Sequence, residues 1–420
     1  MERDELAAWL RLTLTPGVGN GTARKLLAAF GLPQAIFEQP HSALTQVVSS
    51  NQASALRSAP PELASLLDTT WDWQQQDNPH GLRHQVLALG DSGYPQALLR
   101  LDDPPLMLYL LGTAQFIPNS PLAPVDTAQA ALKIDKVSGI EKSTDEHTGS
   151  GIDPLHSLAV VGSRNPTPQG ADNARRFAKA MAQAGLTIVS GMALGVDGAA
   201  HAGALEGAAD DATGLTVAVV GTGLDRVYPK AHRELAHRIA RHGVLVSEYP
   251  LGTPPITANF PKRNRLIAGL ANGTLVVEAA LKSGSLITAR LTTEQGKEVF
   301  AIPGSIHAAQ SRGCHALIKQ GAKLVESAQD ILEELQWPLQ LQSASNSIAA
   351  DAYSEGATGH NDINSGLLSA LGFDPVGLDA LQARCGLDAA QLQAELMGLE
   401  LEGQVARLPG GLYQRLSGTQ

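Results

Sequence analysis

The sequence has few cysteines and no long apolar run, and each of these shortages excludes a class of protein. Cys314 and Cys385 lie far apart, so they offer neither a metal-ligand spacing nor a disulfide framework. No stretch of eighteen apolar residues occurs, and the acidic, amphipathic start is unlike a signal peptide. We therefore expect a cytoplasmic protein without a membrane segment, and we assign it no metal and no cofactor.

Positive charge is also scarce, but it is unevenly distributed along the chain. The 420 residues carry 31 Lys and Arg against 41 Asp and Glu, a net charge of −10. Residues 158–330 hold 18 of the basic and 13 of the acidic residues, which leaves this region at +5 and the remainder at −15. A basic centre between acidic ends favours an anionic partner, although chance variation among solvated faces would give the same count.

The N-terminal part of the chain reads as a small helical domain over residues 1–80. Gly17-Val18-Gly19 forms a turn between two helical stripes, as in a helix-hairpin-helix, and Gly31 is expected to end the second helix. Such a hairpin can offer backbone N–H groups to a phosphate. Because this segment is acidic, a purely structural role is equally consistent with it.

A larger core is expected over residues 81–337. It begins with a strand at 85–91 and a Pro-broken segment at 94–111, and residues 113–153 are a flexible insertion rich in Pro, Ser and Thr. Six apolar, β-branched runs then alternate with helical stretches: Leu158–Val161, Thr187–Val189, Thr216–Val220, Val244–Val246, Thr274–Val277 and Val299–Ile302. This alternation predicts an α/β fold with an extended Rossmann-like parallel sheet and helices on both faces.

The C-terminal region is predicted to be a separate winged-helix domain. Residues 338–364 read as a linker, and residues 365–420 hold three short helical patterns followed by a hairpin at 405–413. The domain has only Arg384, Arg407 and Arg415 against six acidic residues. Because a major-groove reader normally needs more positive charge, we favour a protein-contact or packing role over a transcription regulator.

Small residues and cations follow most of the strands predicted in the core. The carboxyl ends of parallel strands meet at one edge of the sheet, where glycine-rich turns and helix N-termini accept anions. Several such loops with five cations fit a chain of phosphates better than a single phosphate. The candidate DNA-binding residues are Gly162, Ser163, Arg164, Ser190, Gly191, Thr222, Lys230, Lys262, Arg263, Asn264, Arg265, Ser283, Gly284 and Ser285.

Each feature of this edge has a plainer alternative. Gly221-Thr222-Gly223 is also ordinary turn geometry, and it lacks the spacing of a dinucleotide fingerprint. Asp197 and His201 have the spacing of an acid/base pair, but a helix-capping Asp and a packed His are favoured. The cations could pair with Asp225, Glu234 or Glu248 and only hold the fold, whereas Tyr228 and Phe260 could stack on bases.

Five sequence blocks resemble the DNA-processing protein A family (DprA, also called Smf). They are AVVGSRNPTPQG, SGMALGVDGAAH, VAVVGTGLDRVYP, SEYPLGTPPITANFPKRNRLIAGL and VVEAALKSGSLITARLTTEQGKEVFAIPG. The resemblance implies a dimeric protein of natural transformation that binds single-stranded DNA, shields it and loads the recombinase RecA, without catalysing a reaction. It also implies that Arg164, Lys230, Arg263 and Arg265 bind DNA.

Some positions depart from the family pattern, and an enzyme remains the alternative. His232 and His315 stand where the family usually has Asn, and Gln169 replaces an aromatic residue. The alternative is a nucleotide-processing hydrolase that resembles the LOG-type phosphoribohydrolases. Its glycine-rich block with a Glu is expected after the fifth strand, where this chain reads Lys282-Ser283-Gly284-Ser285-Leu286-Ile287-Thr288.

Overall fold

The computed structural model describes residues 1–76, 81–116, 151–207, 215–337, 362–372 and 375–416. Its centre is a nine-stranded sheet with the order β1-β2-β8-β7-β6-β5-β9-β10-β11. The strands are β1 (Arg83–Ala88), β2 (Met107–Gly112), β5 (Ser157–Val161), β6 (Thr187–Ser190), β7 (Thr216–Val219), β8 (Val244–Ser247), β9 (Gly273–Val276), β10 (Glu298–Ala301) and β11 (Lys323–Leu324). All six apolar runs predicted to be strands are therefore confirmed.

The strands from β8 to β11 in this order are parallel, while β2 pairs antiparallel with both β8 and β1. The antiparallel strand β2 corrects the sequence prediction, which treated residues 94–111 as one Pro-broken segment. Pro104 and Pro105 end the irregular part, and the apolar run after them forms a fully paired strand. The sheet is thus parallel in its centre with an antiparallel extension at one edge.

Helices cover both faces of the sheet, as predicted. Leu158 and Val160 of β5 pack with α7 (Pro168–Gln183), α8 (Val196–Glu206) and α13 (Ala328–Glu334). Ala159 and Val161 point to the other face, with α10 (Asn259–Gly269), α11 (Ser285–Glu294) and α12 (Arg312–Lys319). Alternate side chains of one strand enter opposite layers because successive residues of a strand face opposite ways.

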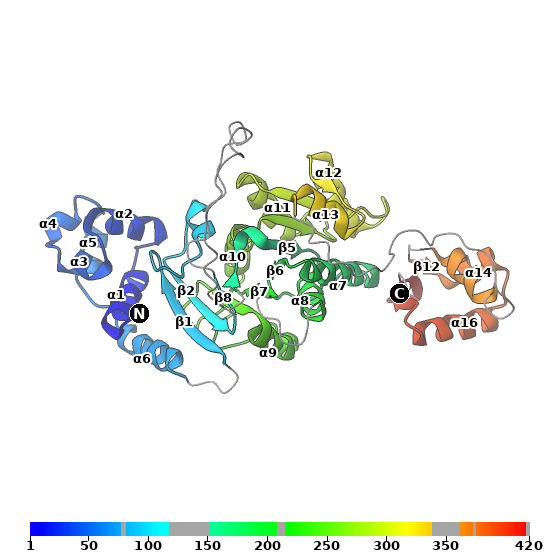
Figure 1. Cartoon of the computed structure of the whole chain (residues 1–420), viewed down its shortest axis with the longest axis horizontal. Helices are drawn as coiled ribbons and strands as arrows, with labels where there is room; N and C mark the ends of the chain where they lie inside the picture. The colour runs from blue at the N-terminus through cyan, green and yellow to red at the C-terminus, as the bar shows by residue number, and fades with distance from the viewer. Residues whose placement is uncertain (77–80, 117–150, 208–214, 338–361, 373–374, 417–420) are drawn as a thin grey trace, which may run out of the picture.

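The helical domain packs directly on the antiparallel edge of the sheet (Figure 1). It consists of α1 (Arg3–Leu14), α2 (Asn20–Phe30), α3 (Pro33–Glu38), α4 (His41–Leu44), α5 (Ser50–Leu56) and α6 (Leu63–Gln74). Gly31 has a φ of +84° and its N–H donates to the carbonyl of Leu27, which confirms it as the C-cap of α2. The ring of Trp73 lies 6.2 Å from that of Tyr109 in β2, so this domain and the sheet share one apolar core with α9 (Arg233–His242).

Two predicted flexible segments fall largely outside the described residues. The insertion expected at 113–153 is described only at its ends, where β3 (Gln115–Phe116) and β4 (Gly151–Ile152) pair in parallel. The predicted linker at 338–364 overlaps the first residues of the next helix, α14 (Asp362–Leu371). Residues 117–150 and 338–361 lie outside the described residues.

The C-terminal domain has the predicted three helices and hairpin (Figure 1). Its helices are α14, α15 (Leu378–Cys385) and α16 (Ala389–Leu401), and its hairpin is β13 (Val405–Leu408) with β14 (Leu412–Arg415). Val376 and Gly377, directly before α15, form a short strand, β12, against β14. Among the described helices of the whole chain, none is both long enough and apolar enough to cross a bilayer.

Candidate nucleic-acid interface

The strand order creates a crevice between β5 and β9. Chain connections from β5 proceed through β6 and β7 to β8 on one side, and from β9 through β10 to β11 on the other. The loops that follow β5 and β9 therefore leave the sheet in opposite directions, and ligands of open α/β sheets bind at this point. The predicted loops 162–164 and 283–285 flank this crevice.

A cavity of about 490 Å³ occupies the crevice. It brings together a large part of the predicted site: Gly162, Ser163, Arg164, Arg263, Asn264, Ser283, Gly284 and Ser285. Lys282, which sequence reasoning did not select, also lines it and is exposed. Its position directly before the predicted Ser283-Gly284-Ser285 turn is the signal that could have identified it.

The N-terminus of α11 opens into this first cavity. Gly284 is its N-cap and supplies no side chain, and the hydroxyl of Ser283 lies 2.7 Å from that of Ser285. The first N–H groups of the helix already donate within the turn, those of Ser285 and Leu286 to Ser283. The helix dipole still favours an anion here, and the ammonium of Lys282 and the guanidinium of Arg164 add positive charge. The cavity is chemically suited to a phosphate.

The N-terminus of α7, by contrast, is already occupied by a carboxylate of the protein. Glu278 accepts hydrogen bonds from the backbone N–H of Thr167 at 2.9 Å and from its hydroxyl at 2.5 Å. Burial raises the pKa of Glu278, against the effect of these hydrogen bonds. The carboxylate that follows β9 therefore caps a helix.

A second, more apolar cavity of about 230 Å³ adjoins the first and shares Arg164, Ala193, Phe260 and Arg263 with it. The rings of Tyr228 and Phe260 lie 5.6 Å apart at an interplanar angle of 33°, and Tyr228 is 46% exposed. The guanidinium carbon of Arg164 lies 5.8 Å from the centre of the Phe260 ring. A flat aromatic ligand can stack in the second cavity while an anion attached to it enters the first.

The loop after β6 forms one wall of the second cavity. Met192 and Leu194 line it, and Met192 has a φ of +64°, a conformation uncommon for a residue with a side chain. His232 donates a hydrogen bond from Nδ1 to the carbonyl of Met192 at 3.0 Å. The histidine that departs from the family pattern therefore holds this wall in place.

The structure corrects the interpretation of Arg263 as a cation free to meet a phosphate. Arg263 is only 4% exposed, and its Nη1 donates to the carbonyl of Gly191 at 2.5 Å and to the carbonyl of Val219. A Cβ on Gly191 would lie 2.3 Å from that nitrogen, so the glycine admits the guanidinium rather than a ligand. Burial lowers the pKa of Arg263, and the nearby Asp197 opposes this. Arg263 forms the floor of both cavities.

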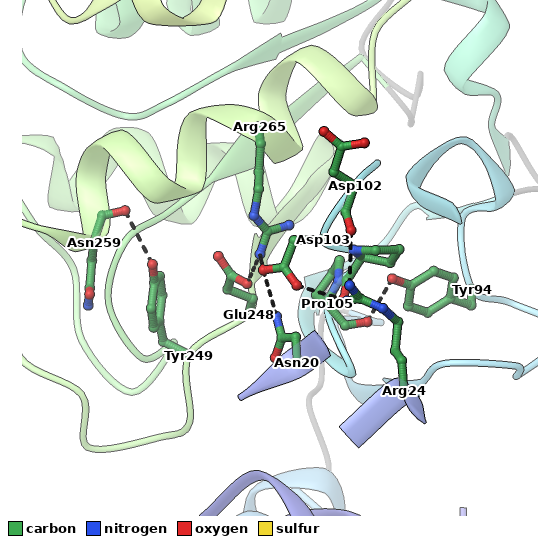
Figure 2. A network of polar contacts seen from close by, with 11 residues as sticks. Asn20, Arg24, Tyr94, Asp102, Asp103, Pro105, Glu248, Tyr249, Asn259 and Arg265 are labelled. Carbon is green, nitrogen blue, oxygen red and sulfur yellow. Dashed lines mark hydrogen bonds and ion pairs between the residues drawn. The ribbon is translucent and has the colours of Figure 1, made fainter. Parts of the chain in front are cut away.

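Arg265, unlike Arg263, lines neither cavity, and Figure 2 shows it beside two carboxylates. Its guanidinium pairs with Glu248 and lies 3.9 Å from Asp103, and its side chain is 12% exposed. The ion-pair alternative is therefore correct for Arg265 and Glu248. Asp225 instead pairs with Arg226 at 2.7 Å.

The remaining candidates are divided between the interior and the outer rim. Ser190 is fully buried and donates to the carbonyl of Val160 at 2.6 Å, which corrects its selection as a ligand contact. Thr222 lines the second cavity but is 2% exposed. Lys230 and Lys262 are exposed outside the linings of these two cavities, so they can meet only a ligand that extends beyond them.

Asp197 and His201 do not form an acid/base pair. His201 is fully buried with Nδ1 2.7 Å from the hydroxyl of Thr216, and burial lowers its pKa to about 3. Asp197 accepts the backbone N–H of Ala193 at 3.2 Å, which fixes the turn into α8. The packed-histidine alternative is confirmed.

Comparison with known proteins gives matches to two family models and to several relatives. The family model for DNA recombination-mediator protein A matches residues 150–336, and that for the DprA winged helix domain matches residues 354–411. Protein Smf of Escherichia coli (strain K12) is 44% identical over 267 residues, covering 62% of this chain and 69% of that protein. Protein Smf of Synechocystis is 31% identical over 439 residues, covering 99% of this chain and 100% of that protein.

A solved structure is similar as well. The X-ray structure of DNA processing protein A from Streptococcus pneumoniae superposes with a TM-score of 0.58 at 30% sequence identity, over 80% of this chain and 98% of that one. The chain belongs to the DNA-processing protein A (DprA, Smf) family.

Proposed function

We propose that this protein binds single-stranded DNA across the two adjoining cavities at the carboxyl edge of the sheet. The observation that carries the proposal is the position of Arg164, an exposed cation shared by the larger cavity, which Lys282 and the Ser283-Gly284-Ser285 turn also line, and the smaller cavity, which two aromatic rings line. A nucleotide would place its phosphate near the N-terminus of α11 and its base beside Phe260. Lys230 and Lys262 would meet neighbouring phosphates along the strand.

Preference for single strands follows from the same arrangement. The second cavity accepts a base only if that base is unstacked, and bases in a duplex are already paired and stacked. Stacking also depends little on which base is present, so recognition would be largely independent of sequence. The phosphate contacts would make the affinity fall steeply with salt.

A binding titration tests this function. Fluorescence anisotropy would compare a labelled single strand with its duplex at two salt concentrations, using the full chain and the Arg164→Ala variant. Arg290→Ala is the matched control, because Arg290 is a 70% exposed arginine on α11 outside both linings. Tighter binding to the single strand, weakened by the Arg164 substitution only, supports the proposal. Equal affinity for duplex, or no effect at Arg164, contradicts it.

The wider role that we propose comes from family membership. In this role the protein is a cytoplasmic homodimer that protects incoming DNA in natural transformation and loads RecA onto that DNA. The test is RecA-dependent ATP hydrolysis on DNA coated with single-strand-binding protein. Addition of this protein is expected to shorten the lag, and an unchanged lag would contradict RecA loading.

We also propose that the site catalyses no reaction, in contrast to the hydrolase alternative. Glu278 is bound to Thr167, and Asp197 is bound to the turn before α8, so both carboxylates near the crevice already have structural partners. Incubation with nucleoside monophosphates or labelled DNA should yield no product. Turnover abolished by a single substitution in the first cavity would establish the enzyme.

A further inference from the structure

The helical domain contacts the core through a polar network, which Figure 2 shows in detail. Arg24 of α2 donates to the carboxylate of Asp103 at 2.8 Å and to the carbonyls of Asp102 at 2.9 Å and Pro104 at 3.2 Å. Asn20, at the start of the same helix, donates to Asp103 at 3.2 Å. Helix α2 therefore holds the loop 102–105 both through backbone carbonyls of the loop and through the side chain of Asp103.

The same loop is held from the core side. The hydroxyl of Tyr94 donates to the carbonyl of Pro105 at 2.8 Å, and Tyr94 is 4% exposed. The 3₁₀ helix that precedes the loop, Gln96–Arg100, packs on the end of α10, where a Cβ on Gly269 would lie 2.8 Å from Leu98. The loop is thus fixed between α2 and α10.

Asp103 joins the two sides because its second oxygen faces α10. This oxygen lies 3.9 Å from the guanidinium of Arg265, which is also paired with Glu248 at the end of β8. The guanidinium nitrogens Nε and Nη1 of Arg265 have no hydrogen-bond partner among the described residues. The buried cation on α10 is therefore held only through one of its nitrogens and by the surrounding charge.

The two carboxylates beside Arg265 differ in how readily they carry charge. Burial raises the pKa of Glu248, against the attraction of Arg265. Burial also acts to raise the pKa of Asp103, but the hydrogen bond from Arg24 and the charge of Arg265 outweigh it and lower that pKa. Asp103 is thus in contact with a cation of the helical domain, Arg24, and lies beside the cation of α10, Arg265.

The helix held in this way is the one that carries the proposed DNA contacts. Phe260 and Asn264 of α10 line the cavities, and Arg263 forms their floor. The hydroxyl of Tyr249, next to Glu248, donates to the carbonyl of Asn259 at 3.2 Å, so the end of β8 also supports the first turn of α10. A shift of α10 would move the stacking ring and both cavity walls together.

We propose that Asp103 is a positioning residue for DNA binding, through which α2 of the helical domain holds α10 in its binding position. This inference rests on the function proposed above and adds to it a role for a domain that contributes no cation to the cavities. The affinity for single-stranded DNA then depends on residues of the helical domain that do not touch the DNA.

The test uses the full chain with Asp103→Asn and Arg24→Ala, together with Asp103→Glu as the charge-conserving variant. Arg3→Ala is the matched control, since Arg3 pairs with Asp68 inside the same helical domain and does not contact the core network. Amide hydrogen exchange of α10 is measured without DNA, and the affinity for a labelled oligothymidine is measured separately. The melting temperature is recorded for each variant.

Asp103→Asn and Arg24→Ala are expected to speed exchange in α10 and to weaken DNA binding by roughly 3- to 10-fold, with Asp103→Glu close to the parent. Their combined effect should be smaller than the sum of the two, because they break the same link. Arg3→Ala should leave both readouts unchanged.

Two results would overturn the inference, and each is distinct from failure of the proposed function. Unchanged exchange in α10, with DNA binding intact, would show that Asp103 does not position the helix. Faster exchange over the whole domain, matched by Arg3→Ala, would show a general loss of stability. If the parent chain itself fails to bind oligothymidine, the proposed function fails, whereas exchange in α10 still reports on the link.

Discussion

Arg164 and Arg263 line the same two cavities, yet they differ in exposure and in what they bind. Arg164 is exposed and lies over the ring of Phe260, so its positive charge faces the open space. Arg263 is 4% exposed, and its Nη1 donates to backbone carbonyls at the ends of β6 and β7, whereas its Nε has no hydrogen-bond partner among the described residues. Exposed residues such as Arg164 form a rim that is available to a ligand. Buried residues such as Arg263 form a layer beneath the rim and hold its loops in place.

A cation near a strand end is therefore not by itself a binding residue. A guanidinium that is buried against backbone carbonyls is shielded from a phosphate in solution, whatever its place in the sequence. The neighbouring Lys262 and Arg263 illustrate the point, because one is exposed and the other is buried. Substitutions in the buried layer should therefore change stability, and substitutions in the rim should change affinity.

The largest effect is expected from Arg263→Ala. It leaves the carbonyls of Gly191 and Val219 and the carboxylate of Asp197 without their buried partner, at a cost of about 3–5 kcal/mol in the free energy of unfolding. Urea denaturation measures this loss. Lys262→Ala, at the adjacent exposed position, should change it by less than about 0.5 kcal/mol. An Arg263 variant as stable as the parent would remove the distinction between the layers.

Phe260→Leu should have the next largest effect, and on affinity rather than stability. Leucine keeps an apolar side chain against Gly221 but removes the aromatic face, which is worth about 1–3 kcal/mol per stacked base. Binding to a single strand should weaken by that free energy, and the ratio of single-strand affinity to duplex affinity should decrease. Phe260→Tyr keeps the ring and is the control. Tight binding by the leucine variant would exclude stacking in the second cavity.

Arg164→Ala is expected to weaken single-strand binding roughly ten-fold, about 1.4 kcal/mol, with an unchanged melting temperature. If Arg164 neutralises one phosphate, the slope of log affinity against log salt should become shallower by about 0.7. Lys230→Ala is the contrasting substitution, because Lys230 is exposed outside both cavity linings. It should lower the affinity for a single strand only about two-fold. A larger effect at Lys230 would place the main phosphate contacts outside the cavities.

Removal of the winged-helix domain should have the smallest effect. Its helix α16 contains no Lys or Arg, and residues 365–420 carry three basic and six acidic residues. A chain of residues 1–337 should therefore bind single strands within about two-fold of the full chain, by the same anisotropy titration. A loss of ten-fold or more would assign this acidic domain a direct part in DNA binding.

Most of the core could be predicted because buried parallel strands read as continuous apolar runs, and six of these runs are strands. The strand β2 was missed although its residues are equally apolar, because the prolines just before it suggested an irregular segment. In the site, the loops after β5 and β9 were located correctly, since the carboxyl ends of parallel strands share one edge. Lys282 was not selected, because the adjacent turn Ser283-Gly284-Ser285 was chosen for its backbone alone.

The use of each cation could not be predicted from local pattern. Successive residues of a helix point about 100° apart, so Lys262, Arg263 and Arg265 were certain to face different directions. Which direction was outward depended on partners distant in sequence, including Gly191, 72 residues from Arg263, and Asp103 beside Arg265. From the sequence, the pairing of Arg265 with Glu248 was one of several possible ion pairs, and the fold brings these two residues together.

Strand period, turn residues and helix starts are local properties of the chain, and they were enough to predict an α/β sheet with small residues and positive charge at one edge. The position of the crevice between β5 and β9, the exposure of Arg164 in it, and the burial of Arg263 and Arg265 depended on the packing of the whole fold. The reason is physical: the exposure of a charge is set by the segments that pack around it, and these come from all parts of the chain.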